Sequence, residues 1–480
     1  METSMSCPSA FVRSSFPKFL TLAVLVVPSI LSLALQSPAQ TKLSSGNSCA
    51  KFGDSFQNSN DLVALESYRS AVRKMVEDED FNQLDCIADS ARANKTRFPG
   101  GKWQLYTFYR GVSEVHGHAT EEDWNQLIGH LKKWVAAKPK SITAPVALAE
   151  SYINFAWHAR GDGFSSTVTE SGWKLFAQRT EQAKEILDNA SSLPTKCPHW
   201  YVAMQLVAKA EGWDLGKSTE LFKEATALAP DYYYYYRYLA DYMLPKWEGE
   251  EGDASNFAEQ SANRLGGTKG DMLYFRIGEK MVCACDEPEF KRLSWQRLQK
   301  GYEAIVKEYG LSTSDLNTLA LMATKNNDSV AADAAFQDIS DNYDIDTWIT
   351  EDYFKQMKTW ASQFAPLESR SRKIEAEAEA NALSPDGPVY QNKAEQALAS
   401  IVQACAKEAD DKSPFQFMLQ IAADGIPKDG WAQEPTSVGQ CVLKNIYDSH
   451  VKKEALFTQP PHPDYWIKLS FDPAASVAAK

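Results

Sequence analysis

Between Asp61 and about Ala365 the apolar residues recur every three or four positions, which is the spacing of one face of a helix. Residues Thr120 to Asp123 have the pattern of a capping box, the local signal for the start of a helix. One continuous apolar stripe follows: Trp124, Leu127, Ile128, Leu131, Trp134 and Val135. A later stripe contains Trp173, Phe176, Ala177, Thr180 and Leu187. No strand alternation of comparable length interrupts the region, so the sequence predicts that it is all-α.

These helices are expected to form pairs that repeat along the chain. Trp213 and Trp247 are separated by nearly the same interval as Pro194 and Pro230. This interval matches the period of about 34 residues that is typical of tetratricopeptide-like helical hairpins. Because a single hairpin cannot cover its own apolar face, neighbouring hairpins stack and leave a concave surface. A longer interval at Gly161 to Ser171 makes the predicted solenoid irregular.

The pattern changes towards the C-terminus. Arg370 to Leu383 is polar and alanine-rich, which indicates a solvated helix, and a turn-forming segment follows it. We therefore predict that residues 367–390 are a solvated helix and linker, after a helical-repeat domain at residues 61–366. Residues 391–474 then contain helical segments and an alternating strand at Phe415 to Ile421, with a last strand at Tyr465 to Phe471. This order predicts a small α+β domain.

The N-terminus has the features of an export signal. A basic segment precedes the uncharged apolar run Phe19 to Leu35, and Ser37 to Ala39 supplies the small residues that a signal peptidase recognises. We predict a signal peptide at residues 1–39, followed by a mature N-terminal segment at residues 40–60. The alternative is a retained membrane anchor, but the run is at the short limit for crossing a bilayer and Pro28 interrupts it. We therefore expect an exported, periplasmic or extracellular protein.

The cysteines of an exported chain are candidates for disulfides. Cys49 and Cys86 lie close together near the mature N-terminus, and Cys405 and Cys441 lie on neighbouring helical segments near the C-terminus. We predict one disulfide within each pair. The pairing of the remaining cysteines stays open: Cys197, Cys283 and Cys285. A metal site at Cys283 and Cys285 is less favoured, because a tetrahedral site needs four ligands and no second close pair exists.

Composition narrows the range of partners. Fifty basic and 63 acidic residues among 480 leave a net charge of −13, and no local basic patch stands out. Nucleic acid is therefore not an expected partner.

Several motifs of the helical region are distinctive: Arg97 to Trp103, Phe108 to Gly111, Phe155 to Gly161, Cys197 to Tyr201, Gly212 to Asp214, Pro230 to Tyr236 and Leu244 to Gly249. Together they resemble a bacterial family of exported helical-repeat proteins known as domain of unknown function 4034, over roughly Asp85 to Ala365. The resemblance implies a tetratricopeptide-like fold and a bacterial envelope setting, but no activity. The C-terminal part weakly resembles the end domain of TonB-type energy-transducing proteins.

Three predicted hairpin ends are polar and aromatic, and we expect them to line one rim of the solenoid. Their residues are Trp157, His158, Arg160, Asp162, Trp213, Asp214, Trp247 and Glu248. Aromatic rings with a few charges suit a binding surface. The alternative is that the tryptophans hold adjacent hairpins together while the charges cap helices or face water.

Signals for catalysis are weaker. His158 and Asp162 are one helical turn apart, but a single pair of this kind is a weak motif. His116 and His118 lie on a polar loop and are more often unliganded than metal-bound. The sequence has no HExxH, GxSxG or phosphate-binding loop motif. We expect no cofactor and no metal.

Three functions remain as hypotheses. The first is a non-catalytic interaction module that binds a peptide or protein of the cell envelope on a helical-repeat surface. The second is a hydrolase-type enzyme using His158, Asp162 and Glu248. The third is a purely structural scaffold of the envelope. The position of these side chains relative to one another distinguishes the first two.

Overall fold

The computed structural model describes residues 47–56, 60–115, 117, 119–161, 163–282, 287–411, 413–431, 436–447 and 457–473. The predicted signal peptide, Asp162, the histidines at 116 and 118, and the cysteines at 283 and 285 lie outside these residues. The chain divides into two compact units, Met1–Lys358 and Thr359–Lys480, and each is described by itself.

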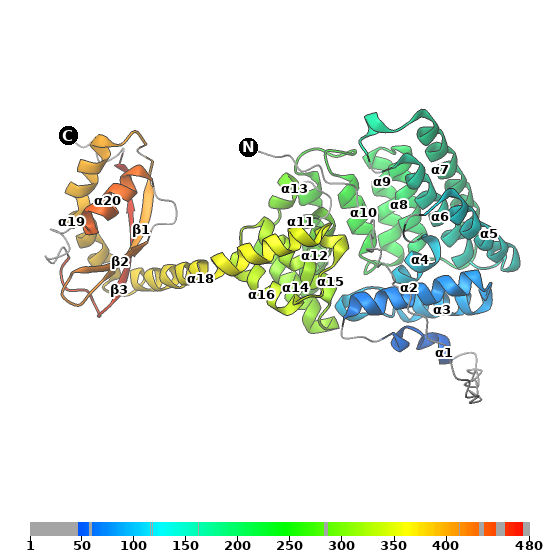
Figure 1. Cartoon of the computed structure of the whole chain (residues 1–480), viewed down its shortest axis with the longest axis horizontal. Helices are drawn as coiled ribbons and strands as arrows, with labels where there is room; N and C mark the ends of the chain where they lie inside the picture. Colours follow the sequence, from blue (N-terminus) through cyan, green and yellow to red (C-terminus); the bar gives the residue numbers. More distant parts are fainter. Residues whose placement is uncertain are drawn as a thin grey trace, which may run out of the picture. The chain divides into compact units, whose positions relative to one another are not determined.

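Unit 1 is built from helices, as Figure 1 shows. They are α1 (Asn47–Ala50), α2 (Asp61–Glu77), α3 (Phe81–Asn94), α4 (Gln104–Ser113), α5 (Glu121–Ala137), α6 (Thr143–Arg160), α7 (Glu170–Ala190), α8 (Pro198–Glu211), α9 (Leu215–Leu228), α10 (Tyr234–Tyr242), α11 (Asp253–Leu265), α12 (Gly267–Val282), α13 (Glu287–Lys291), α14 (Trp295–Tyr309), α15 (Thr313–Lys325), α16 (Ser329–Ile339) and α17 (Ile345–Trp348). Successive helices pack against each other from α5 to α10, so the predicted fold of helical hairpins is confirmed.

Local capping explains where several of these helices begin and end. The predicted capping box opens α5: Asp123 N donates to Thr120 Oγ1 at 3.2 Å, and Thr120 N donates to Asp123 Oδ2 at 2.8 Å. Gly212 ends α8 with a φ of 65°, a left-handed conformation that glycine adopts without strain. Asp214 then caps α9 by accepting a hydrogen bond from Lys217 N at 2.9 Å. This tight turn fixes the position of Trp213 between the two helices.

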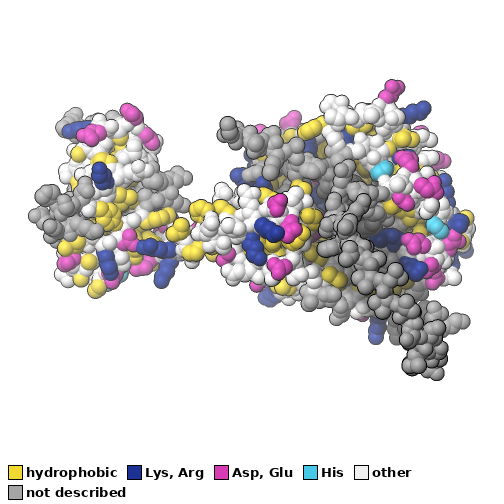
Figure 2. Space-filling view, viewed as in Figure 1, with side chains coloured by type: hydrophobic (Ala, Val, Ile, Leu, Met, Phe, Trp, Pro, Cys, Tyr) yellow, Lys and Arg dark blue, Asp and Glu magenta, His cyan; other side chains and the backbone are white. Residues whose placement is uncertain are grey.

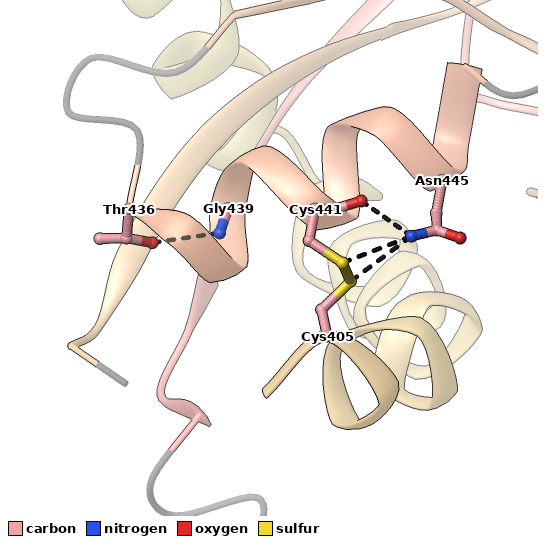
Figure 3. The surroundings of a disulfide bond; sticks show 5 residues. All are labelled: Cys405, Thr436, Gly439, Cys441 and Asn445. Atoms are coloured by element: carbon pink, nitrogen blue, oxygen red, sulfur yellow. Dashed lines mark hydrogen bonds between the residues drawn. A yellow bond between two sulfur atoms is a disulfide. The ribbon is translucent and has the colours of Figure 1, made fainter. Parts of the chain in front are cut away.

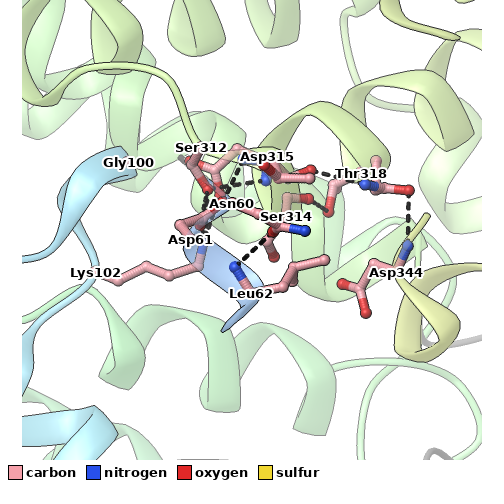
Figure 4. Close-up of polar contacts among 12 residues, drawn as sticks. Asn60, Asp61, Leu62, Gly100, Lys102, Ser312, Ser314, Asp315, Thr318 and Asp344 are labelled. Atoms are coloured by element: carbon pink, nitrogen blue, oxygen red, sulfur yellow. Dashed lines mark hydrogen bonds and ion pairs between the residues drawn. The ribbon is translucent and has the colours of Figure 1, made fainter. Parts of the chain in front are cut away.

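The first helices of unit 1 contact the last ones through a buried polar cluster (Figure 4). We call Asp61, Lys102, Arg276, Ser312 and Asp315 the polar clasp. Ser312 Oγ donates to Asp61 Oδ2 at 2.7 Å, and Lys102 Nζ lies 2.7 Å from Asp315 Oδ1. Arg276 donates to both carboxylate oxygens of Asp315, at 2.9 and 3.0 Å. The clasp therefore joins the start of α2 to the start of α15, near the two ends of unit 1 in the sequence.

The motif from Arg97 to Trp103 brings its backbone close to this cluster. Gly100 has a φ of 69°, and a Cβ atom there would lie 2.5 Å from Asp315 Oδ2. Its carbonyl accepts a hydrogen bond from Arg276. Although burial raises the pKa of Asp315, the charges of Arg276 and Lys102 outweigh that effect and hold it at about 2. Asp315 is therefore a buried carboxylate that stays ionised in the folded chain.

Aromatic side chains fill the middle of unit 1. Nearly every residue of α4 is buried, and so are all five tyrosines from Tyr232 to Tyr236. Tyr106 of α4 stacks on Tyr234 with ring centroids 3.6 Å apart, and Trp103 meets Tyr232 edge-on at 4.9 Å. The chain's own aromatic rings thus form the packed interior of this part of unit 1.

The stability of unit 1 should depend on pH through Asp344, the residue before α17. Burial, and then the neighbouring Asp346, raise the pKa of Asp344 from 3.8 to about 6. The folded state therefore binds this proton more tightly than the unfolded state, so wild-type stability falls as the pH rises from about 4 to about 6. We expect Asp344→Asn, which keeps an acceptor for Asp346 N, to raise the free energy of unfolding by about 1 to 2 kcal/mol at pH 8.

Urea denaturation of both proteins at pH 4 and pH 8 checks this expectation. The increase in the free energy of unfolding should be absent or reversed at pH 4, because the carboxyl group of Asp344 is already protonated in the folded wild type at that pH. Asp341→Asn, at an exposed position nearby, is the control and should have little effect at either pH. A gain of the same size at both values of pH would show that the charge of Asp344 is not its cause.

Unit 2 contains the end of α18 (Glu351–Ala382), then α19 (Gly387–Glu408) and α20 (Ser437–Tyr447), with strands β1 (Phe415–Ile421), β2 (Pro427–Trp431) and β3 (Tyr465–Phe471). The strands form an antiparallel sheet in the order β2-β1-β3, with Leu419 opposite Ile467. The predicted small α+β fold is confirmed. Strand β2 was not predicted, because its sequence contains proline and glycine and does not alternate.

The segment from Arg370 is helical, as predicted, but the helix is not solvated on every side. Helix α18 continues to Ala382, and α19 begins at Gly387. Ile374 and Ala378 of α18 are buried together with Met418 and Trp466 on the sheet. Since only two apolar residues, one of them alanine, make this contact, the sequence showed no stripe. The second unit accordingly starts at Thr359, before the boundary we expected at residue 366.

Each unit has one of the two predicted disulfides, and both pairings are confirmed. Cys49 is bonded to Cys86 in unit 1, and Cys405 is bonded to Cys441 in unit 2. Figure 3 shows that the second bond joins α19 to α20, where Asn445 Nδ2 lies 3.5 Å from both sulfur atoms. The side chains around it form a separate apolar core between the helices and the sheet.

Across the parts of the chain that the structure describes, no helix combines the length and the apolar composition that crossing a bilayer requires.

Candidate functional site

The structure brings two of the predicted tryptophans into contact. Trp157 lies near the end of α6, and Trp247 lies in the turn after α10. Their rings meet edge-on, with centroids 6.3 Å apart and planes at 85°. Both side chains are half-buried, so part of each ring remains at the surface. Two residues that are distant in the sequence thus form one aromatic pair.

Two cations lie over these rings. Lys209 Nζ is 3.9 Å from the centroid of Trp247, and the Arg160 guanidinium is 5.5 Å from that of Trp157. Lys209 also contacts Asp241 Oδ2 at 2.5 Å. Burial lowers the pKa of Lys209 despite this partner. Although burial opposes it, Lys209 and other lysines hold the pKa of Asp241 well below its usual range. Asp241 therefore stays ionised at neutral pH, and its contact with Lys209 holds the lysine over the ring.

The aromatic surface extends onto α7. Phe176 meets Trp157 at 4.9 Å, and Trp173 meets Phe176 at 5.8 Å. Arg160 lies 5.5 Å from the centroid of Trp173, which is 39% exposed. In the sequence, Trp173 and Phe176 belong to the apolar stripe of one helix. Their distance from Trp157 depends on how α6 and α7 pack, and the helical period does not contain that information.

Trp213 forms a second group, joined to Glu248 through Tyr242. Tyr242 Oη donates to Trp213 O at 2.6 Å, and Glu248 N donates to Tyr242 O at 3.2 Å. Burial, then the charges of Glu248 and Asp214, raise the pKa of Tyr242 to about 12. The two predicted carboxylates therefore gather near one tyrosine hydroxyl. We use the name aromatic rim for Trp157, Arg160, Trp173, Lys209, Trp213, Asp214, Tyr242, Trp247 and Glu248.

His158 faces a different part of the surface from Trp157. It is exposed, and its ring lies 6.1 Å from Trp124 and 6.3 Å from Phe155. Adjacent residues of a helix point about 100° apart, and here Trp157 contacts Phe176 and Trp247 whereas His158 lies near Trp124. Asp162 lies outside the described residues. The hydrolase hypothesis needs His158 and Asp162 side by side, and the described residues do not test that arrangement.

A buried histidine that is not among the predicted site residues has carboxylate and hydroxyl partners. His199 Nε2 is 2.8 Å from Glu150 Oε2, and its Nδ1 is 2.9 Å from Tyr232 Oη. Tyr109 stacks on the same ring at 4.1 Å. All four side chains are buried, so a substrate cannot reach them. We assign them a structural role, since a buried histidine needs partners for both nitrogens.

Comparison with known proteins found a family match for the first part of unit 1. Residues 68–213 match the family model described as Domain of unknown function (DUF4034). The resemblance expected from the motifs is confirmed for these residues. The DUF4034 match runs from α2 to the turn at Trp213, so it includes Trp157 and Arg160 but neither Trp247 nor unit 2. No curated protein matches the chain. The family description states no activity.

Metal ligands do not cluster in the described part of the chain: no group of three or more His, Cys, Asp or Glu side chains there is placed to hold an ion.

Proposed function

We propose that unit 1 is a non-catalytic interaction module that binds a protein or peptide on the aromatic rim. The contact between Trp157 and Trp247, with Arg160 and Lys209 over the rings, carries this proposal. Tryptophan and arginine are the side chains that most often dominate binding energy at protein interfaces. The rings of Trp157 and Trp247 are already held by packing, so these side chains lose little entropy on binding.

The filled interior of unit 1 favours the rim over an inner groove. Tyr106 and Tyr234 stack closely on each other inside unit 1. The ends of α6, α8 and α10 therefore offer the better surface, and Trp173 extends it with an exposed ring. A partner that contacts these helix ends buries aromatic area without displacing any packed residue.

Charge supports a protein partner over nucleic acid. The chain has a net charge of −13, and basic and acidic side chains lie intermixed on the face of unit 1 shown in Figure 2. The rim itself combines the cations of Arg160 and Lys209 with the carboxylates of Asp214 and Glu248. A surface with both signs suits a polypeptide better than a polyphosphate.

Substitution of the rim tests the proposal. The full-length protein is used as bait for its binding partner in an extract of the organism that makes it, and the captured protein is then purified and titrated. We expect Trp157→Ala with Trp247→Ala to weaken binding about tenfold or more. Trp173→Ala, at an exposed position, should weaken binding without a change in melting temperature.

Trp200→Ala is the matched control, because Trp200 is a half-buried tryptophan near the start of α8, away from the rim at the other end of that helix. It should leave the affinity unchanged. Rim variants that fold normally and still bind the partner at wild-type affinity would instead support the view that these tryptophans only hold the hairpins together.

We also propose that the chain is exported, with residues 1–39 removed as a signal peptide. The apolar run before Ser37 to Ala39 supports this, and so do the two disulfides, since such bonds persist in oxidising compartments. The setting would be a bacterial envelope or its exterior. The weak resemblance of the C-terminal part to the end domain of TonB-type proteins supports a second partner for unit 2.

A further inference from the structure

Three arginine side chains lie where α2 packs against α4. Arg69 and Arg73 are one helical turn apart on α2, so they share a face of that helix. Arg110 belongs to α4, and Gly111 beside it allows the two helices to approach closely, because a Cβ atom there would collide with Val72 of α2. The contact between α2 and α4 therefore brings the three guanidinium groups into one region of unit 1.

One carboxylate in this region is only partly ionised. Arg110 Nε contacts Glu114 Oε1 at 2.6 Å, and the Glu114 side chain is buried. Burial raises the pKa of Glu114 to about 7, although the charges of all three arginines oppose this shift. At neutral pH Glu114 therefore supplies less than one negative charge to balance three cations.

A second carboxylate contacts the arginines of α2 only loosely. Glu66 lies 3.6 Å from Arg69 Nη1 and 3.8 Å from Arg73 Nη2, and both distances are longer than a hydrogen bond. The Glu66 side chain is 47% exposed, and Ser70 Oγ donates to it at 3.2 Å. Because an exposed ion pair of this length contributes little to stability, a ligand can displace Glu66 easily.

Arg73 has a pair of donors without acceptors. Its Nε and Nη2 atoms are shielded from solvent, and neither makes a hydrogen bond to any described residue. Arg69 Nε is in the same situation. Nε and Nη2 lie on one edge of the guanidinium, and such an edge can donate two parallel hydrogen bonds to the two oxygens of a carboxylate. Since buried donors without acceptors cost stability, the free edge of Arg73 indicates a missing carboxylate.

We propose that Arg69, Arg73 and Arg110 form a binding site for a small dicarboxylate, which displaces Glu66 when it binds. One carboxylate of the ligand accepts hydrogen bonds from Nε and Nη2 of Arg73 and from Nε of Arg69. The second carboxylate pairs with Arg110. Two negative charges match the excess of positive charge that remains once Glu66 has moved away. The site contains no residue of the aromatic rim, so it does not depend on the function proposed for the rim.

Titration calorimetry of the folded full-length protein with succinate at pH 7 tests the proposal. We expect saturable binding of one succinate per chain. Arg73→Lys keeps the charge but loses the paired donors, so it should weaken binding about tenfold. Arg264→Lys is the matched control, because Arg264 is an exposed arginine of α11, and it should leave the affinity unchanged. Absence of saturable binding to the wild type, or equal affinities of Arg73→Lys and the wild type, would overturn the proposal.

A variant of Glu66 tests the displacement and does not require any change to the arginines. Glu66→Gln removes the competing charge, so it should tighten the binding of succinate about threefold. Glu181→Gln, at an exposed position on α7, is the control and should have no effect. Unchanged or weaker binding by Glu66→Gln would show that Glu66 belongs to a structural cluster that no ligand enters.

Sulfate tests the choice of a dicarboxylate. It has the same charge as succinate at pH 7, but its oxygens surround a single atom, so it can pair with one guanidinium edge without extending to a second arginine. We expect sulfate to bind at least about fivefold more weakly than succinate. Equal affinities would overturn the assignment of the ligand class. Trp157→Ala with Trp247→Ala should bind succinate as the wild type does, so a failure of the rim proposal is distinguishable from a failure here.

Discussion

Replacing Arg276 with methionine should lower the free energy of unfolding of unit 1 by about 3 to 5 kcal/mol, because it leaves a buried charge without its main partner. Arg276 is 3% exposed and donates both to Asp315 and to Glu279 Oε2, at 3.0 Å in the latter case. Methionine fills much of the same volume but supplies no donor. Lys102 would remain as the only cation close to Asp315 within the clasp.

The loss should also depend on pH in a defined direction. Arg276 and Lys102 lower the folded-state pKa of Asp315 to about 2, below its ordinary value of 3.8. The stabilisation is therefore fully present above about pH 4 and is lost as the pH falls towards 2. Urea denaturation followed by tryptophan fluorescence at pH 7 and pH 3 should show a smaller difference between Arg276→Met and wild type at pH 3.

Lys74→Met is the control for this experiment. Lys74 pairs with Asp78 at 3.0 Å, but its side chain is 70% exposed, so its loss should change stability by no more than about 0.5 kcal/mol. A loss below about 1 kcal/mol for Arg276→Met would mean that the first and last helices of unit 1 do not depend on the polar clasp.

Removing the disulfide of unit 2 should have the second largest effect. Cys405 and Cys441 are 36 residues apart, and replacing both with alanine should lower the stability of unit 2 by about 2 to 4 kcal/mol. The bond restricts the unfolded chain between α19 and α20 and also holds these helices over a sheet of three strands. Hydrogen exchange of the full-length protein should therefore become faster in peptides from Gly387–Glu408 and Ser437–Tyr447.

The pattern of exchange distinguishes this effect from a general loss of stability. Peptides from unit 1 should exchange as in the wild type, because the bond lies wholly within unit 2. Asn445→Ala, which removes the amide beside the two sulfurs but leaves the bond, is the matched control and should have a much smaller effect. Faster exchange throughout unit 1 would contradict the local role of the disulfide.

Several features of this fold were predictable because they depend on neighbours in the sequence. The stripe after Thr120 and its capping box lie within one helix, and the alternation from Phe415 to Ile421 lies within one strand. The two disulfides were predictable for a related reason, since each joins cysteines that are close in the sequence and have no nearer competitor.

The candidate site was predicted in part. The repeat spacing of Trp213 and Trp247 marked two hairpin ends, but Lys209 and Tyr242 gave no separate signal, since each lies inside a helix among packing residues. His158 was predicted to lie beside Trp157 because both belong to the same polar and aromatic hairpin end. The structure separates the two, since successive helical residues point in different directions.

The sequence by itself determined the helical character of unit 1, strands β1 and β3 and two cysteine pairs, because periodicity, capping and short separations are local properties. Only the tertiary structure decided that Asp61 meets Ser312, that tyrosines fill the interior, and that Ile374 covers a sheet strand. Such contacts join segments that are distant in the sequence. Whether two such segments meet depends on the packing angles of all the helices between them. A small change in any one packing angle would place different side chains together, so no local pattern encodes them.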